Sequence, residues 1–371
     1  MFKEKTVIII PAYKPDFKLL DTISGILGEG FKKILVVNDG SGEAFNEVFD
    51  KVREIPQCEL LVHPVNRGKG AALKTAFAYF VKNCECYSCA VTADADGQHL
   101  PHDIKSVAEE TVSSGKVILG VRDFSSPGVP ARSKSGNRIT SAVFKIFFGM
   151  NISDTQTGLR GFPSEYISEL IKADGDRYEY ETNMLFLMNK KRIPYGEVKI
   201  STVYIEENKS SHFRVVRDSI RIYGLIIKYL LSAVGALLID CGMFNILNVT
   251  GWFAKVKVPL TSLVLPNTVI PHVLARIISS IFNYFVNARV VFKDEANKST
   301  LLKYYALATV QLAVGMGAVA LICHLSPIDH WLFDGAVHLL VQAILYPLSF
   351  RIQHKWVFNS SSESEKLINT K

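Results

Sequence analysis

Four apolar stretches, each about as long as a membrane span, fill most of the second half of this 371-residue chain. They cover residues 225–247, 269–292, 304–325 and 333–358. A helix needs about 20 apolar residues to cross a bilayer. Buried helices of a soluble bundle would keep charged faces for water, and these segments have too few charges to form them. We therefore predict an all-α, four-span transmembrane domain over residues 224–359.

Basic residues are distributed unequally between the ends of these spans. Lys and Arg lie before the first span, between the second and third, and after the fourth, which predicts a multi-pass protein of the plasma membrane with both termini and the N-terminal half in the cytoplasm. Arg214, Arg217 and Arg221 recur at helical spacing, so residues 214–223 are predicted to form an amphipathic linker at the lipid headgroups. The polar tail, residues 360–371, is predicted to be disordered. A net charge of +7 is too mild to indicate a nucleic-acid partner.

The membrane half contains an internal repeat. The second span ends Asn-Ala-Arg-Val-Val-Phe at residue 292, and the fourth ends Gln-His-Lys-Trp-Val-Phe at residue 358, 66 residues later. Two helices per unit return the chain to the same face, so the two units share one orientation. Asp240, Asn245, Arg276, Asn283 and Asn287 are costly in hydrocarbon and indicate a bundle interior. Two interpretations stay open: a polar transport path, or packing contacts in which Asp240 pairs with Arg276.

The first half alternates short β-branched runs with amphipathic segments. We predict strands at 6–10, 34–38, 59–62, 90–94 and 116–121, with helices at 17–27, 44–53, 69–82 and 101–113 between them, and a further strand at 198–205. This order predicts an α/β domain with a Rossmann-like, mostly parallel sheet covered on both faces. Ligands bind such sheets beyond the carboxyl ends of the strands.

Four polar loops follow the predicted strands at that edge. They contain Pro11-Ala12-Tyr13, Asn38-Asp39-Gly40-Ser41, Asn66-Arg67-Gly68-Lys69-Gly70 and Asp94-Ala95-Asp96-Gly97-Gln98-His99. By itself, the second loop is equally well explained as a plain turn, and His99 as a residue at a helix entry. Together, the loops predict a ligand site.

Asp94 and Asp96 give the most specific chemical indication. Two close carboxylates repel unless a cation joins them, and hard oxygen ligands favour Mg²⁺ or Mn²⁺ bridging to substrate phosphates. The alternative is a pair of exposed loop acids. Cys84, Cys86 and Cys89 also cluster, but they lack the fourth ligand of a structural zinc site, so we read them as reduced thiols.

These motifs together resemble the family 2 glycosyltransferases of the GT-A fold, and more narrowly dolichol-phosphate mannosyltransferase and related polyprenyl-phosphate enzymes. The resemblance covers about residues 4–215. It includes Gly120-Val121-Arg122, the run Asp154-Thr155-Gln156-Thr157-Gly158-Leu159-Arg160-Gly161-Phe162, Tyr178-Glu179-Tyr180-Glu181 and Lys209-Ser210-Ser211. Residues 224–359 resemble the GtrA-like membrane family, whose members are proposed to move polyprenyl-linked sugars across the bilayer.

The resemblance implies a role for each motif. The nucleotide of the donor would be held by Pro11, Ala12, Tyr13, Asp39, Arg67, Gly68 and Asp94. Mg²⁺ or Mn²⁺ would be held by Asp94, Asp96 and Gln98. The acceptor phosphate and the sugar would meet Arg122, Arg132, Arg138, Gln156, Glu181 and Ser210. Asp96, Arg122 and Arg138 would be catalytic. Glu179 and Glu181 are also explained as acids favoured at a helix N-terminus.

The resemblance implies a cytosolic GT-A domain over residues 1–213 that transfers a sugar from a nucleotide-sugar, with a UDP-sugar favoured, to undecaprenyl phosphate with inversion. Two alternatives keep the same fold: a GDP-mannose donor, or a glycolipid hydroxyl as acceptor with the spans acting only as an anchor. A third hypothesis of a different class makes flipping of lipid-linked sugar the main function. A homo-oligomer is compatible with all of these.

Overall fold

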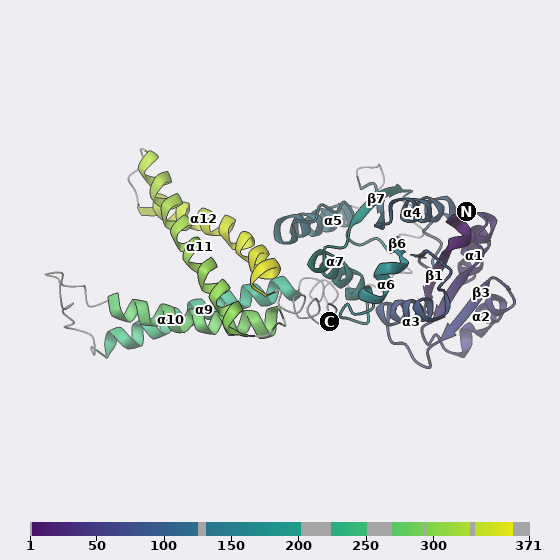
Figure 1. Cartoon of the computed structure of the whole chain (residues 1–371), viewed down its shortest axis with the longest axis horizontal. Coiled ribbons are helices and arrows are strands. Elements are labelled where there is room, and N and C mark those ends of the chain that lie inside the picture. Colours follow the sequence, from purple (N-terminus) through teal and green to yellow (C-terminus); the bar gives the residue numbers. More distant parts are fainter. Residues whose placement is uncertain are drawn as a thin grey trace, which may run out of the picture. The chain divides into compact units, whose positions relative to one another are not determined.

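The chain forms two units, residues 1–222 and 223–371, which are described separately. The computed structural model describes residues 2–124, 131–201, 224–250, 269–292, 294, 296–326 and 331–358. The predicted linker at 214–223, Ser210 and the tail at 360–371 lie outside these ranges. In Figure 1 the first unit runs from purple to teal and the second from green to yellow.

A seven-stranded mixed sheet forms the centre of the first unit. Its order is β3-β2-β1-β4-β6-β5-β7. The strands are β1 (Thr6–Ala12), β2 (Ile34–Asn38), β3 (Cys58–Val62), β4 (Cys89–Thr92), β5 (Val117–Arg122), β6 (Arg160–Pro163) and β7 (Tyr195–Ile200). All neighbours pair in parallel except β6, which is antiparallel to both β4 and β5. The carboxyl ends of β1, β2 and β4 therefore meet at one edge.

Helices cover both faces of this sheet, as β1, β2 and β4 require because nearly all their residues are buried. One face packs against α1 (Lys18–Gly28), α2 (Asn46–Arg53) and α4 (Pro101–Ser114), through a core that includes Ile8, Ile23 and Ile104. The opposite face carries α3 (Lys69–Asn83), whose Phe77 meets Phe162 of β6 edge to face at 5.2 Å. In Figure 1, α3 and α4 lie on opposite sides of β1.

The remaining helices of this unit follow β5 and β6. They are α5 (Ala131–Val143), which continues into a π-helical turn at Phe144–Phe148, α6 (Ser164–Leu170) and α7 (Glu179–Lys191). Helix α3 contacts both α6 and α7. This packing brings the N-terminal end of α7 towards the loops that follow β2 and β4.

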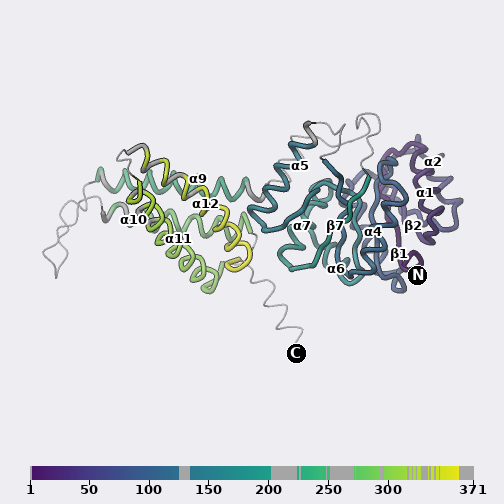
Figure 2. Tube along the Cα trace, turned by 90° about the horizontal axis from the view of Figure 1, so that it is seen from above, coloured from purple at the N-terminus to yellow at the C-terminus, as the bar shows by residue number. Residues whose placement is uncertain are grey.

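The four predicted apolar segments of the second unit are helical over their described residues. They form α9 (Gly224–Val249), α10 (Val269–Val286), α11 (Lys298–Leu325) and α12 (Trp331–Ile352). Two of them, at Ile227–Leu247 and Lys298–Val319, are long and apolar enough to count as candidate spans. Helices α9 and α10 pack together, as do α11 and α12, and Figure 2 shows the four helices from above in green to yellow.

The two helix pairs show the repeat in their geometry. Helices α10 and α12 both end in π-helical turns, at Asn287–Val291 and Gln353–Val357. The first residues of these turns contact each other, because Asn287 Nδ2 donates to Gln353 Oε1 at 3.0 Å. Arg276 and Asp240 pair at 3.4 Å, as one of the two open interpretations of these polar residues has it.

Candidate active site

Glycines set the positions of two loops at the sheet edge. Gly40 and Gly68 have φ angles of +65° and +108°. A Cβ on Gly40 would collide with the backbone of Val65, and one on Gly68 with the carbonyl oxygen of Asp176. Only glycine allows both this conformation and this close approach. The loops after β2 and β3 are therefore packed against each other.

Asp39 holds these two loops together from inside. Its Oδ1 accepts from Arg67 N (2.9 Å) and from His63 Nδ1 (2.7 Å), while Oδ2 accepts from Gly68 N (2.7 Å) and Asn66 Nδ2 (3.0 Å). Asp39 is only 2% exposed. Four donors engage its carboxylate, so the arrangement favours Asp39 as a positioning residue for the loop before α3.

Lys69, the first residue of α3, connects this loop to Asp94. Its ammonium lies 2.7 Å from Asp94 Oδ1 and 3.1 Å from Glu181 Oε1 on α7. Burial alone would raise the pKa of the Asp94 carboxyl. The positive charge of Lys69 has the larger effect and holds this pKa well below its usual range. In turn, the two carboxylates raise the pKa of Lys69. Asp94 is therefore a fixed anion.

His99 fixes the backbone of the same loop. Its Nδ1 accepts a hydrogen bond from Asp94 N at 3.0 Å, which assigns the proton of the neutral ring to Nε2, 3.9 Å from Asp94 Oδ2. Burial lowers the pKa of His99, which keeps the ring neutral. His99 is thus a structural member of the site and not merely a residue at the entry of α4.

Asp96 is the acid left without a cation in this loop. Burial, followed by the negative charge of Asp94, raises the pKa of Asp96, and Gln98 N donates to its Oδ1 at 3.0 Å. Strand β4 ends at Thr92, two residues earlier than predicted, so both acids belong to the loop and not to a strand face. No group of three His, Cys, Asp or Glu side chains that could hold a metal ion is found within the described ranges.

The net charge of the site is nevertheless negative, which favours binding of a cation. The formal charge is −1 when it is taken over the cations Lys69, Arg122 and Arg160 and the carboxylates Asp94, Asp96, Asp154 and Glu181. Mg²⁺ commonly uses one or two carboxylates and completes its shell with water and substrate phosphates. Asp94, Asp96 and the amide oxygen of Gln98 fit such an open ligand set.

Arg122 ends β5 and forms a bidentate pair with Asp154. Its Nε and Nη2 donate to Asp154 Oδ2 (2.7 Å) and Oδ1 (3.1 Å), and Asp154 is fully buried. Gln156 N also donates to Asp154 Oδ1, at 3.1 Å. The pair fixes the direction of the Arg122 guanidinium beside the loop at residues 154–158.

That loop packs directly on Asp94. A Cβ on Gly158 would lie 2.5 Å from Asp94 Oδ2, and Thr92 Oγ1 donates to the carbonyl of Gly158 at 2.8 Å. Arg160, which is 1% exposed, donates from Nε to Thr157 O (2.9 Å) and from Nη1 to Glu181 O (2.6 Å). A buried guanidinium therefore joins the loop to α7.

A small pocket of about 50 Å³ marks where these elements meet. Its lining residues come from the ends of β5 and β7 and from the loops after β4 and before β6: Asp94, Gln98, His99, Arg122, Gln156, Thr157, Gly158, Ile200 and Ser201. Several predicted donor, metal and acceptor residues thus share one cavity.

The other predicted site residues are less closely gathered. Pro11 and Ala12 end β1, and Tyr13 follows them at the same edge. Arg67 and Arg138 are exposed, Arg138 on α5. Arg132 lies in α5, but its side chain is outside the described part, as is Ser210.

Sequence reasoning gave no separate role to Lys69, His63 or Arg160. Lys69 and Arg160 both lie within quoted motifs. His63 carries no pattern of its own, but it lies between Asp39 and Thr75 Oγ1, which is 2.9 Å from its Nε2.

Comparison with known proteins agrees with this geometry. Residues 7–171 match the model of glycosyl transferase family 2, and residues 228–358 match the GtrA/DPMS transmembrane domain. An uncharacterized protein of Methanocaldococcus jannaschii is 29% identical over 61% of this chain and 93% of its own. The UDP-N-acetylglucosamine–dolichyl-phosphate N-acetylglucosaminyltransferase of Methanococcus voltae is 28% identical over 54% of this chain and 86% of its own. The undecaprenyl-phosphate mannosyltransferase of Micrococcus luteus is 24% identical over 56% of this chain and 86% of its own.

The fold and the site define a membrane-bound glycosyltransferase with a GT-A, Rossmann-like mixed sheet. The chain combines a glycosyl transferase family 2 domain in its first half with a GtrA/DPMS transmembrane domain in its second half.

Proposed function

We propose that this enzyme transfers a sugar from a nucleotide-sugar, with a UDP-sugar favoured, to undecaprenyl phosphate. The observation that carries the proposal is the Asp94–Asp96 loop, in which Lys69 contacts one carboxylate oxygen of Asp94 and Asp96 forms no ion pair with a described cation, so that both acids keep oxygens for a metal ion. The relatives named for dolichyl phosphate and undecaprenyl phosphate support a lipid phosphate as the acceptor.

In this proposal Asp94, Asp96 and Gln98 hold Mg²⁺ or Mn²⁺, which when bound neutralises the charge that develops on the departing diphosphate. Lys69 keeps Asp94 ionised and in place. Asp39 positions the loop containing Arg67 and Gly68, which binds the nucleotide with Pro11, Ala12 and Tyr13.

The acceptor phosphate acts as the nucleophile. A phosphate monoester has a second pKa of about 6, so it is largely dianionic at neutral pH and needs no general base. Its oxygen attacks C1 of the sugar, the bond from C1 to the diphosphate breaks, and the electron pair leaves with the nucleoside diphosphate, inverting C1. Arg122 orients the acceptor, with Arg132 and Arg138 of α5, Gln156 and Ser210 as further contacts. Glu181 contacts the sugar.

The distribution of basic residues supports a location for the protein. We propose that all four helices α9–α12 span the plasma membrane with the enzyme and both termini in the cytoplasm, supported by Lys228, Lys303 and Arg351 at one end of the helices. Product would then form at the cytoplasmic face as a lipid-linked sugar for cell-envelope glycosylation.

A transfer assay tests the proposal. Purified chain, Mg²⁺ or Mn²⁺, undecaprenyl phosphate and a panel of labelled donors (UDP-glucose, UDP-N-acetylglucosamine, UDP-galactose, GDP-mannose) should give lipid-extractable label with one donor. Label from GDP-mannose alone would select the mannosyltransferase alternative, which the Micrococcus luteus relative favours. If label enters a glycolipid with a free hydroxyl and never undecaprenyl phosphate, the acceptor is wrong.

A further inference from the structure

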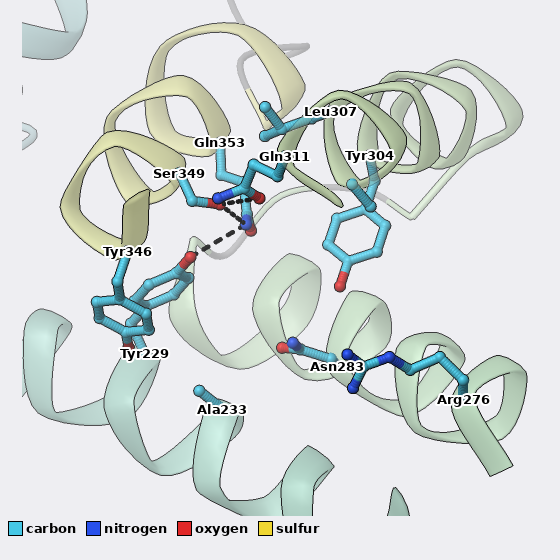
Figure 3. A pocket seen from close by; sticks show the side chains of 11 residues that line it. Tyr229, Ala233, Arg276, Asn283, Tyr304, Leu307, Gln311, Tyr346, Ser349 and Gln353 are labelled. Carbon is cyan, nitrogen blue, oxygen red and sulfur yellow. Dashed lines mark hydrogen bonds between the residues drawn. The ribbon is translucent and has the colours of Figure 1, made fainter. Parts of the chain in front are cut away.

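Arg276 and Lys69 both contact carboxylates, but their surroundings differ. Arg276 on α10 lines a pocket of about 350 Å³ in the membrane unit, and its side chain is 64% exposed, so the guanidinium pairs with Asp240 and still borders open space (Figure 3). The Lys69 side chain is 18% exposed, and its ammonium contacts two carboxylates, those of Asp94 and Glu181. Lys69 is therefore enclosed by its acidic partners, at the place where the proposed metal ligands lie.

Glycines on both sides of Lys69 fix the position of its backbone. A Cβ on Gly68 would collide with the carbonyl oxygen of Asp176, and a Cβ on Gly70 would collide with the side chain of Tyr180. Both contacts are made with the segment that leads into α7 and with the first turn of this helix, so the start of α3 packs closely against them. The Lys69 ammonium is consequently held between α7 and the loop after β4.

The Lys69 ammonium lies against one of the two carboxylate oxygens of Asp94. It is 2.7 Å from Oδ1, while Oδ2 lies 3.9 Å from His99 Nε2 and would be 2.5 Å from a Cβ on Gly158. The Asp94 side chain is 31% exposed, so an ion can reach the carboxylate. A divalent ion bound there would share the carboxylate with an ammonium, and like charges repel strongly where little water separates them.

The other two acids of the site differ from Asp94 in this respect. Asp96 forms no ion pair with a described cation, so a metal ion meets no competing positive charge on its carboxylate. Glu181 Oε1 lies 3.1 Å from the Lys69 ammonium, and the Glu181 side chain is 12% exposed. A buried cation is costly without a counter-ion, and Glu181 supplies one when a metal takes the charge of Asp94. Lys69 can therefore stay in place and continue to repel the metal ion.

A diphosphate bound with the metal ion changes this balance. Mg²⁺ in proteins commonly joins one or two carboxylates to substrate phosphates, which bring negative charge of their own. These phosphates offset the repulsion between the ion and Lys69, whereas the water molecules around a free ion carry no charge to offset it. Lys69 thus makes the site distinguish a metal ion that arrives with a diphosphate from one that arrives alone.

We propose that Lys69 competes with a divalent ion for the charge of Asp94, so that the site binds free metal weakly and binds it firmly only together with a nucleoside diphosphate. The inference rests on the proposed function, because Asp94, Asp96 and Gln98 are metal ligands only in that proposal. In this role Lys69 is a positioning residue, since it acts on the metal ion through Asp94.

Binding of Mn²⁺ to the full-length protein in detergent, followed by the paramagnetic resonance of free Mn²⁺, tests the inference. Each protein is titrated alone and with UDP or GDP. Lys69→Met should bind Mn²⁺ alone at least about tenfold more tightly than the wild type, because the like charge beside Asp94 is gone. With the nucleoside diphosphate present, this gain should fall below about threefold, because the phosphates already offset the charge of Lys69 in the wild type.

Two matched variants separate competition at Asp94 from a change in net charge. Lys74→Met removes a lysine of the same helix that pairs with Asp176, at 3.0 Å, and it should bind Mn²⁺ as the wild type does. The double variant with Lys69→Met and Glu181→Gln removes one positive and one negative charge, so the net charge of the site is unchanged. It should still bind free Mn²⁺ at least about fivefold more tightly than the wild type.

Lys69→Met with the Mn²⁺ affinity of the wild type, or a weaker one, would overturn the inference; if this variant does not fold, the double variant decides in the same way. Equal gains in Lys69→Met and Lys74→Met, or no gain in the double variant, would reduce the effect to net charge and overturn it as well.

If no protein binds Mn²⁺ even with UDP or GDP, the proposed metal ligands are wrong and the inference fails with them. Failure of the proposed sugar transfer is seen separately, when the wild-type protein labels no lipid, and Mn²⁺ binding is measured without either substrate.

Discussion

The two halves of this enzyme hold their polar side chains in different ways. In the catalytic unit, the Lys69 ammonium forms ion pairs with the carboxylates of Asp94, at 2.7 Å, and Glu181, at 3.1 Å. The membrane unit has the Asp240–Arg276 ion pair, but Asn287, Gln353 and their partners are neutral and share hydrogen bonds. Removing a charge in a partly buried site leaves another charge unpaired, whereas removing one amide leaves only a neutral group unsatisfied. Substitutions should therefore cost more in the first unit than in the second.

The largest effect is expected at Asp96. Asp96→Ala should lower kcat by about a thousandfold and abolish metal dependence. The substitution removes a proposed ligand of the metal ion that would neutralise the charge on the departing diphosphate. The melting temperature should change little, since the carboxylate lies in a loop. Transfer of labelled sugar to undecaprenyl phosphate measures this, with the exposed Asp21→Ala as control. Full activity of Asp96→Ala in a chelator would contradict the metal site.

Arg122→Ala should follow, with the acceptor KM raised or kcat lowered roughly ten- to a hundredfold, because a charge-assisted contact contributes about 1.5–3 kcal/mol. Initial rates at varied acceptor and fixed donor measure it, and nucleotide-sugar affinity should stay unchanged. Because Asp154 loses its partner, Arg122→Ala with Asp154→Asn serves as the control that restores neutrality. Collapse of donor binding in both variants would place Arg122 on the donor side.

A smaller effect, confined to alkaline pH, is expected from Cys89. Burial raises the pKa of the Cys89 thiol to about 11 from an ordinary value near 9. The folded state holds the thiol proton more tightly than the unfolded state does. The contribution of Cys89 to the free energy of unfolding is therefore complete below pH 9 and falls by about 2 kcal/mol as the pH rises towards 11. Urea unfolding of the catalytic unit from pH 7 to 11 measures it. Cys89→Ala should flatten this decline and the exposed Cys86→Ala should not; an equal decline in both would contradict the assignment.

The smallest effect is expected in the membrane unit. Gln353→Ala breaks hydrogen bonds to Asn287, Tyr229 and Ser349 but should cost only about 1 kcal/mol, because side-chain hydrogen bonds between membrane helices are individually weak. Unfolding by SDS in mixed micelles measures it. Thr309→Ala is the control, since the Thr309 hydroxyl bonds only within its own helix. A loss as large as that from breaking a buried charge pair would remove the contrast between the two units.

Most of the fold follows from local sequence patterns. The helices at α3 and α4 begin where predicted, at Lys69 and Pro101, because glycine or proline marks each start. Strand β6 was not predicted, since Arg160–Pro163 has no β-branched run and is held in the sheet by tertiary pairing with β4 and β5. Strand β7 lies at Tyr195–Ile200, whereas the sequence predicted 198–205.

The site was predictable as a set of loops but not as a set of contacts. Asp94 and Asp96 stand out because two acids follow a buried strand. Lys69 could not be paired with Asp94 and Glu181 from sequence, because that contact needs α3, α7 and the loop after β4 to meet. The contacts of Arg160 could not be predicted from sequence either, because its guanidinium donates to backbone carbonyls of the loop before it.

The contact between Asn287 and Gln353 has a consequence for the ancestry of the membrane unit. These residues are equivalent positions of the two repeats, and a residue that touches its own equivalent lies on the axis relating them. A single two-helix protein could make the same contact by pairing with an identical copy, amide against amide. Gene duplication followed by fusion would then turn a homodimer into one chain, freeing the two copies to diverge into Asn and Gln. The fused chain can therefore carry an arginine, Arg276, in one of its two repeats only, and a symmetric ancestor could not.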